Sequence, residues 1–177
     1  MVLVGQKWFQ LCNRLFAMGH LIAAAREYGF SISNLGFEDY AMHFEGPSRD
    51  VWCRYPATSA SFPKGRAICR LAERPICAAT SVVLKYRLGT WMYRAIAVGI
   101  EDEYCLESDE FRDLAKKTLI LAMHGWSFRA PNLFRKHAPS IRAYFEPVKV
   151  LRDRAEETAR RARAKGDVLI GIHIRHG

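Results

Sequence analysis

The last residues of the sequence carry the side chains most suited to chemistry: His173, Arg175 and His176, followed by Gly177. They come directly after residues 168–172, a run of apolar residues and glycine. Such a run predicts a central strand of a parallel sheet. In open α/β sheets, ligands bind at the carboxyl ends of the strands. The sequence therefore predicts a ligand-binding crevice at this end of the chain.

His173 and Arg175 share one face of the predicted strand, because side chains alternate along a strand. The Arg175 guanidinium offers a planar fork of donors that suits a phosphate group. The alternative is a buried arginine or histidine satisfied by backbone carbonyls. A metal site built from His173, His176 and His124 is disfavoured, because no acidic or cysteine ligand stands at a supporting spacing.

A second candidate site is the segment that joins a predicted strand at residues 2–4 to a predicted helix at residues 13–28. We expect Asn13 to cap this helix, so that backbone N–H groups and the positive end of the helix dipole point into a crevice. A phosphate is physically reasonable there. The segment has neither the dinucleotide-binding glycine pattern nor the P-loop pattern. Taken alone, Asn13 is simply a helix cap.

A third candidate is the segment from His124 to Arg129, which follows a predicted strand at residues 119–123. Trp126 and Arg129 have the aromatic and basic character of a surface that binds sugars or nucleotides. Aromatic side chains in such a place are more often part of the core or of a crevice wall.

The pattern of the whole chain predicts an α/β fold, a Rossmann-like domain with a parallel sheet that takes in residues 1–177. The first β-α-β unit ends with a strand at residues 30–35, and Gly29 is expected at the helix C-terminus. The other predicted segments are a loop with short elements at 39–62, a helix or a helix and a strand at 78–98, and helices at 108–117, at 131–145 and from 147 onward.

Charge and cysteine content narrow the function classes. A formal net charge of +9 predicts attraction to anions. The mixed charges of residues 152–163 favour a solvated helix face over a nucleic-acid site, because the acidic residues there would repel phosphates. The five cysteines are scattered and form no Cys-x-x-Cys pair, which indicates reduced thiols and excludes a disulfide framework and a zinc ribbon.

Neither end of the sequence nor its apolar stretches indicate a membrane segment. The longest candidate, residues 15–25, falls short of the roughly 20 apolar residues needed to span a bilayer. The N-terminus lacks the basic region and the cleavage site of an export signal. We expect no transmembrane segment and a cytoplasmic location.

The three candidate segments, in this order, resemble the first half of GDP-fucose-dependent fucosyltransferases. That superfamily includes α-1,2, α-1,6 and protein O-fucosyltransferases. The ending His-Ile-Arg-His-Gly resembles the start of its first motif, and Phe-Gln-Leu-Cys-Asn-Arg-Leu at residues 9–15 lies where these enzymes carry a loop before the first helix. Gly-Trp-Ser-Phe-Arg at residues 125–129, with Ile-Arg-Ala-Tyr-Phe at residues 141–145, is similar to a pattern of the α-1,2 group.

The resemblance implies the N-terminal half of a two-domain, GT-B-like glycosyltransferase that moves fucose from GDP-fucose to a glycan with inversion. It implies that Arg175 is catalytic, holding the β-phosphate and stabilising the charge that grows on the departing GDP. Asn13, His173 and Gly177 would join Arg175 at the donor. Trp126 and Arg129 would line the acceptor side or the crevice wall, and no metal or other cofactor is expected.

The resemblance also implies partners that this sequence does not supply. The acidic residue expected after the motif and the guanine- and ribose-binding segments would follow Gly177, so we expect a chain truncated before the nucleotide-binding domain and inactive alone. The nucleotide-sugar donor and the glycan acceptor are then its ligands, and nucleic acid is not.

Two alternatives stay open from the residues. One is a non-catalytic basic domain that binds anionic polymers or nucleic acid. The other is a GT-B transferase that uses a different nucleotide-sugar donor.

Overall fold

The structure is a computed structural model that describes residues 1–7, 10–57, 66–99, 101–164 and 166. The chain divides into two compact units, Met1–Glu146 and Pro147–Gly177, whereas the sequence interpretation places all 177 residues in one domain. The predicted final strand lies outside the described residues, and so do His173, Arg175, His176 and Gly177.

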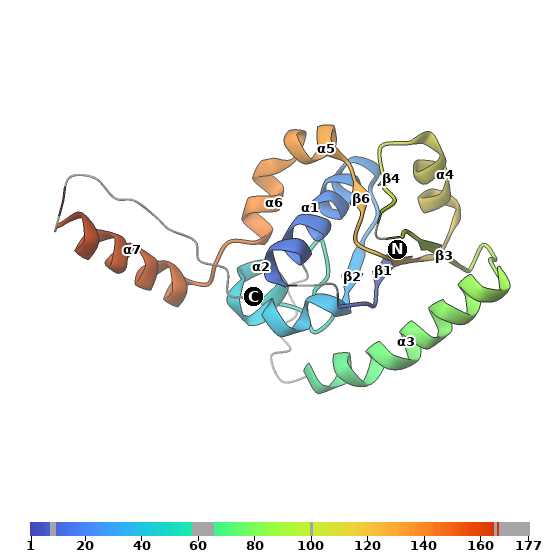
Figure 1. Ribbon diagram of the computed structural model, residues 1–177, viewed down its shortest axis with the longest axis horizontal. Helices are drawn as coiled ribbons and strands as arrows, with labels where there is room; N and C mark the ends of the chain where they lie inside the picture. The colour runs from blue at the N-terminus through green and yellow to red at the C-terminus, as the bar shows by residue number, and fades with distance from the viewer. Residues whose placement is uncertain (8–9, 58–65, 100, 165, 167–177) are drawn as a thin grey trace. The chain divides into compact units, whose positions relative to one another are not determined.

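The first unit is built on a four-stranded sheet with the strand order β2-β1-β5-β3 (Figure 1). All neighbouring strands run parallel, which confirms the predicted α/β fold with a parallel sheet, compatible with a Rossmann-like topology. The strands are β1 (Val2–Val4), β2 (Ile32–Asn34), β3 (Tyr93–Ala97) and β5 (Ile120–His124). A separate parallel pair joins β4 (Tyr104–Cys105) to β6 (Phe128–Arg129).

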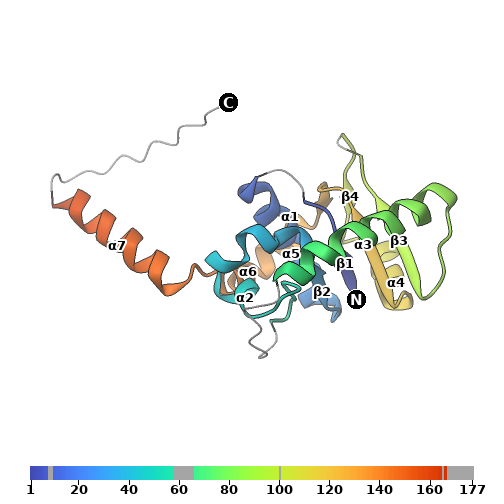
Figure 2. The same cartoon turned by 90° about the horizontal axis from the view of Figure 1, so that it is seen from below.

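Helices cover both faces of the sheet. The helices α1 (Leu11–Tyr28) and α4 (Asp109–Lys117) lie on one face, and α3 (Arg66–Tyr86) lies on the other (Figures 1 and 2). Right-handed crossovers that run in opposite directions across a sheet place their helices on opposite faces. The connections through α1 and α4 run toward β2, and the connection through α3 runs toward β3, so the observed placement agrees with this rule.

The first helix begins earlier than predicted. Gln10 occupies the N-cap position in an extended conformation, so Asn13 lies inside the first turn and its predicted role as the cap is wrong. Leu11 packs against the aromatic cluster around Phe37, and tertiary packing of this kind outweighs capping preferences. The predicted end is confirmed, since Gly29 terminates the helix with a φ of 75°.

The fourth helix follows its sequence signals. The Ser108 hydroxyl accepts a hydrogen bond from the Phe111 N–H at 3.1 Å and caps the helix at the residue where the predicted helix 108–117 begins. Asp109 and Glu110 lie in the first turn, where the helix dipole favours negative charge.

The predicted helix at residues 131–145 is divided into α5 (Pro131–Lys136) and α6 (Ala138–Tyr144). Pro139 lies in the first turn of α6 and has no N–H to continue the ladder of α5. The predicted loop at 39–62 contains the end of the 3₁₀ helix η1 (Leu35–His43) and the short helix α2 (Glu45–Ser48).

Two apolar clusters hold the first unit together. The larger one lies between the sheet and α1 and includes Ile22, Ile32, Phe111 and Leu121, all with no measurable exposure. The smaller one gathers the rings of Phe37, Phe44 and Phe145, whose centroids lie 5.4–5.7 Å apart.

The second unit contributes one described helix, α7 (Lys149–Arg163), which has no buried residue. Ion pairs between successive turns lie on its surface, as between Lys149 and Asp153 at 2.7 Å. This agrees with the predicted solvated face of mixed charge. Within the described residues, no cysteine forms a disulfide, as predicted. Among the described helices, none has both the length and the apolar composition that a membrane crossing requires.

A buried histidine fixes α1 against the segment that follows β6. His20 is 3% exposed, and its Nδ1 accepts a hydrogen bond from the Ala130 N–H at 2.9 Å. The rings of Phe16 and Phe134 enclose it, at 4.6 and 4.7 Å between centroids. Burial lowers the pKa of His20 below its ordinary value, so the imidazole is neutral in the folded protein.

This histidine predicts a loss of stability on mild acidification. Because the folded-state pKa of His20 is lowered, the unfolded chain binds the proton more readily below about pH 6.5, and the free energy of unfolding falls as the pH decreases through that value. A His20→Asn variant keeps an acceptor for Ala130 and removes the titration. Urea unfolding at pH 7.5 and at pH 5 should show a smaller acid loss in the variant. An equal loss in both proteins would contradict this role.

Candidate functional site

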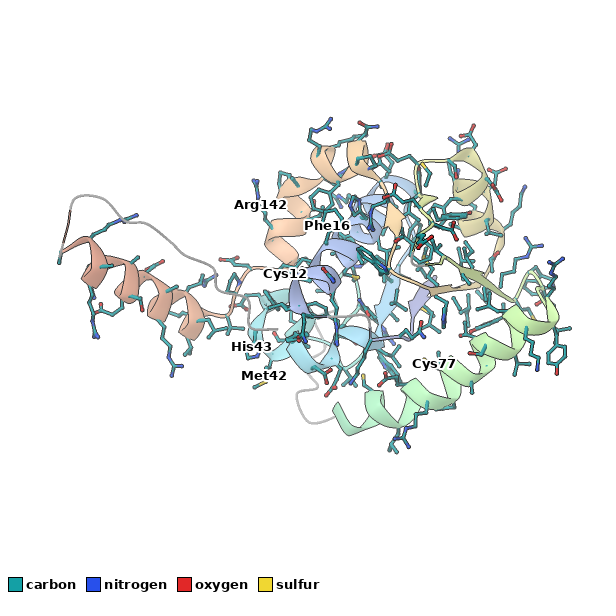
Figure 3. The ribbon with its side chains drawn as sticks, in the orientation of Figure 1. Cys12, Phe16, Met42, His43, Cys77 and Arg142 are labelled. Atoms are coloured by element: carbon teal, nitrogen blue, oxygen red, sulfur yellow. The ribbon has the colours of Figure 1, made fainter. Side chains whose placement is uncertain are left out.

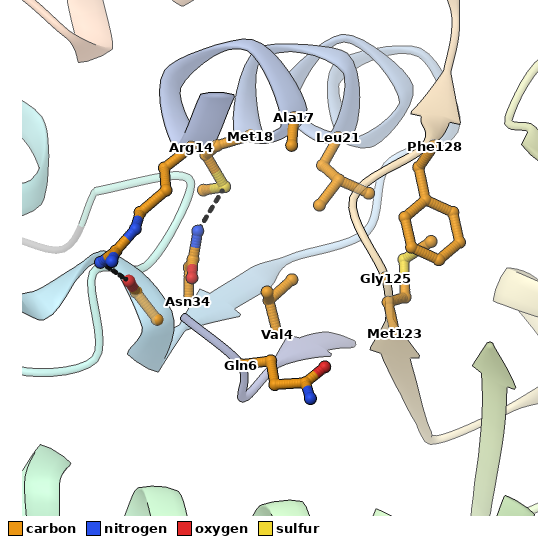
Figure 4. A pocket seen from close by; sticks show the side chains of 11 residues that line it. Val4, Gln6, Arg14, Ala17, Met18, Leu21, Asn34, Met123, Gly125 and Phe128 are labelled. Carbon is orange, nitrogen blue, oxygen red and sulfur yellow. Dashed lines mark hydrogen bonds between the residues drawn. The ribbon is translucent and has the colours of Figure 1, made fainter. Parts of the chain in front are cut away.

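A crevice lies where β2, β1 and β5 end at the carboxyl edge of the sheet (Figure 4). The register places Val4 beside both Asn34 and Met123, so the last residues of β1 and β2 and the penultimate residue of β5 form one row. The first turns of α1 cover this row. The volume is about 30 Å³, enough for one or two water-sized groups. The lining residues are Val4, Gln6, Arg14, Ala17, Met18, Leu21, Asn34, Gly36, Met123, Gly125 and Phe128.

Two glycines allow the chain to close tightly around the crevice. A Cβ atom on Gly36 would lie 2.0 Å from the Gln6 carbonyl oxygen, so no other residue fits beside the loop that follows β1. Gly125 has a φ of 116°, and a Cβ atom there would lie 2.4 Å from the Val98 carbonyl oxygen. The backbone geometry at both positions therefore requires glycine.

Two amide oxygens at the crevice lack hydrogen-bond partners among the described residues. Asn34 is 5% exposed; its Nδ2 lies 3.3 Å from the Met18 sulfur, and its Oδ1 has no partner in that part of the chain. The Gln6 Oε1 is likewise buried without a partner there. Each unsatisfied acceptor costs about 1–3 kcal/mol. A ligand hydroxyl or N–H that donates to these oxygens would recover that cost.

Arg14 brings positive charge to the same crevice from α1. Its Nη1 donates to the Gly36 carbonyl at 2.7 Å and lies 3.4 Å from the Asp39 carboxylate. The guanidinium also lies over the Tyr40 ring, 5.0 Å from its centroid. Figure 4 shows the Arg14 side chain extending from α1 to the Gly36 carbonyl at one side of the crevice.

An ion-pair network beside Arg14 stabilises this arrangement. Lys7 lies 3.0 Å from Asp39 and 3.6 Å from Glu73. Burial alone would raise the pKa of Asp39, but the hydrogen bonds from Lys7 and Arg14 and the charge of Lys7, together with a hydrogen bond to Glu38, outweigh burial, and the pKa is lowered. Asp39 is therefore ionised at neutral pH and balances part of the Arg14 charge.

The composition of the crevice favours binding over acid–base chemistry. Arg14 is the one ionisable side chain among the described residues that line it, and the other polar groups are amides. In the described part of the chain, no cluster of three or more His, Cys, Asp or Glu could hold a metal ion. Amide oxygens and an arginine suit a hydroxylated ligand, an anionic one, or both.

The residues predicted for the site are only partly brought together. Asn13 lies on α1 next to Arg14 and is half-buried, but it does not line the crevice. The predicted donor residues His173, Arg175 and Gly177 lie outside the described residues.

Trp126 and Arg129 lie beside the crevice, and contacts within the protein hold both of them. The Arg129 guanidinium is stacked between the rings of Trp126, at 4.8 Å, and Phe16, at 5.1 Å. It also donates to the carbonyls of Trp126 and Phe128, at 2.9 and 3.1 Å. Figure 3 labels Phe16 on α1. This stack holds the loop whose Gly125 and Phe128 line the crevice, so Arg129 shapes the wall.

His124 ends β5 but lies on the other side of the strand from the crevice, because Met123 lines the crevice and side chains alternate. Burial lowers the pKa of His124 below its ordinary value, so this histidine is neutral at pH 7.

Sequence reasoning missed Gln6, Arg14 and Asn34. A signal for two of them was present, because Gln6 follows the first predicted strand and Asn34 lies at the end of the second. Ligands of open α/β sheets bind at the carboxyl ends of the strands, and the carboxyl ends of parallel strands meet at one edge. Gln6 and Asn34 were therefore candidates for the same reason as the residues after the last predicted strand. Arg14 carried no signal of its own, since its position depends on where α1 begins.

Comparison of the chain with protein-family models, curated proteins and solved structures finds no match. The interpretation of the site therefore depends on the residues of this chain.

Replacing Asn34 by leucine should stabilise the protein without a ligand. Leucine has a similar volume and removes the unsatisfied amide oxygen, so the free energy of unfolding should rise by about 1 kcal/mol or more. Chemical denaturation of Asn34→Leu measures this. Gln10→Leu is the control, because it replaces an exposed amide outside the crevice; it loses only an exposed hydrogen bond from the Tyr40 hydroxyl at 3.3 Å and should change stability little. A destabilised Asn34→Leu protein would contradict the assignment.

Gly29 and Gly125, the glycines with positive φ in the part of the chain that the structure describes, should differ in their tolerance of alanine. Gly125→Ala combines backbone strain with a clash on the Val98 carbonyl and should cost about 3 kcal/mol. Gly29→Ala meets no atom within 4 Å and should cost about 1 kcal/mol. Thermal melting of both variants tests the difference. Equal losses of stability would mean that the backbone at Val98 moves to accommodate the added methyl group.

Proposed function

We propose that this chain is the N-terminal, acceptor-side part of an inverting glycosyltransferase that transfers fucose from GDP-fucose to a glycan. In this proposal its parallel-sheet unit corresponds to the N-terminal half of a GT-B-like fold. The observation that carries the proposal is the buried Asn34 amide at the carboxyl edge of the sheet, whose Oδ1 has no partner among the described residues. Ligands of α/β proteins bind at this edge.

The acceptor glycan would use the crevice through its hydroxyl groups. A sugar hydroxyl can donate to the Asn34 Oδ1, and it can accept a hydrogen bond from a cationic side chain such as Arg14. The crevice holds only one or two water-sized groups, which fits a hydroxyl presented by a sugar ring that stays outside. The stacked Trp126 and Arg129 side chains form the neighbouring wall.

The donor would be held by residues that the resemblance assigns, with Arg175 on the β-phosphate and His173, Gly177 and Asn13 close by. Negative charge grows on GDP as the fucosyl bond breaks, and a fixed arginine stabilises that charge more than it stabilises the ground state. The acceptor hydroxyl attacks the anomeric carbon from the opposite side, which inverts the configuration. An arginine in this role supplies the charge stabilisation that a metal ion provides in other transferases.

Saccharide binding tests the acceptor half of the proposal. Saturation-transfer NMR with lactose, N-acetyllactosamine and chitotriose should show contact with the wild-type chain for at least one of these probes. Asn34→Leu should abolish that contact although the variant is at least as stable. The control Gln10→Leu should retain it. Equal signals from all three proteins, or none from wild type, would overturn the crevice as the acceptor site.

A calorimetric titration with GDP tests the donor half. Millimolar or tighter binding that disappears in Arg175→Ala, and that persists at raised salt, is the expected result. Binding equal in both proteins, or binding that salt alone removes, would point to a non-specific basic surface instead.

A further inference from the structure

The amino edge of the sheet, opposite the crevice, exposes large apolar side chains. Trp91 is 71% exposed, Tyr86 60%, and Leu88 and Leu119 57% each. Three of these four come from the turn between α3 and β3 and its flanks, on the right of Figure 1. Leu119 precedes β5, and its N–H donates to the Trp91 carbonyl at 2.9 Å. We call Tyr86, Leu88, Trp91 and Leu119 the amino-edge surface.

Basic residues surround this surface. Residues 74–100 contain no acidic residue, and Lys85, Arg87 and Arg94 lie among or beside the exposed apolar side chains. The last turn of α4 adds Lys116 and Lys117. The acidic run at residues 101–103 follows the other end of β3 and so belongs to the carboxyl edge.

The acidic groups near the amino edge are engaged in ion pairs. Asp113 lies 3.5 Å from Lys117, and both are exposed. Glu27, at the end of α1, is held by Lys136 at 2.8 Å and by His137 at 2.7 Å. The amino-edge surface therefore carries a net positive charge.

An open hollow of about 520 Å³ adjoins the surface. Trp91, Leu119 and Phe30 give it apolar walls, and Lys116 and Lys117 are at its margin. Apolar walls beside ammonium groups match the chemistry of a lipid headgroup and the upper part of an acyl chain.

We propose that the amino-edge surface docks on an anionic lipid bilayer. Tryptophan and tyrosine partition to the boundary between headgroups and acyl chains, while lysine and arginine bind anionic headgroups. Docking there leaves the crevice, at the opposite edge of the sheet, directed away from the bilayer. The inference is independent of the proposed function, since it depends on different residues.

Charge favours the bilayer over a second copy of this chain. A symmetric dimer through this surface would bring the same basic residues of two chains together, and like charges repel. An acidic protein partner would match the charge, whereas a bilayer matches both the charge and the exposed tryptophan, since tryptophan partitions to its interface.

Sedimentation of the full chain with vesicles tests the proposal. We expect binding to vesicles of equal parts phosphatidylglycerol and phosphatidylcholine, and little binding to pure phosphatidylcholine. The double variant Lys85→Gln/Arg87→Gln should bind about 30-fold more weakly, since each cation near an anionic surface contributes about fivefold. Trp91→Ala should weaken binding by about fivefold, and added salt should weaken wild-type binding.

Matched variants elsewhere on the same unit serve as controls. Arg49→Gln/Arg142→Gln removes the same charge from the end of α2 and from α6, and Met42→Ala removes an exposed apolar side chain from η1 (Figure 3). Both should bind like wild type, and circular dichroism confirms that each variant is folded.

Several results would overturn the proposal. These are no binding to the anionic vesicles, equal binding to pure phosphatidylcholine, or losses in the control variants as large as those at the amino edge. Binding to polyglutamate that the same variants abolish, without vesicle binding, would assign the surface to an acidic protein.

Discussion

The parallel pairing of β1 with both of its neighbours is the constraint on which the rest of the first unit depends. This strand has only three residues, yet it lies between β2 and β5 and is buried along its whole length. Its register aligns Val4 with Asn34 and Met123. That alignment brings the polar end of β2 under α1. Without this register, the Asn34 amide and the α1 side chains would not line the same crevice.

Local signals were sufficient where a structure depends on neighbouring residues. The apolar strands, the Ser108 cap and the terminating Gly29 could be predicted because each involves a few consecutive residues. The start of α1 could not, because Leu11 packs against residues that come more than twenty positions later. The division of α5 from α6 was readable in principle, since Pro139 interrupts the ladder, but the apolar spacing favoured one helix.

The site was less predictable than the fold, because contacts between distant segments determine it. Arg129 has the charge of a ligand-binding residue, yet Phe16 on a different element stacks against it and makes it part of the wall. Asn34 has no distinctive neighbours in the sequence, and its importance comes from the absence of a partner for its Oδ1 among the described residues. The difference in charge between the two edges of the sheet likewise becomes visible only once the position of β3 is known. Basic residues precede β3 at the amino edge, and acidic residues follow it at the carboxyl edge.

The small volume of the crevice has a consequence for selectivity. A space for one or two water-sized groups admits a single functional group of a larger molecule and leaves the remainder outside, where it gains little binding energy. The fixed Asn34 Oδ1 then discriminates by the direction of one O–H bond. A crevice of this kind would contribute little to affinity and much to regiochemistry, because it distinguishes which oxygen of a polyol is held and which stays exposed.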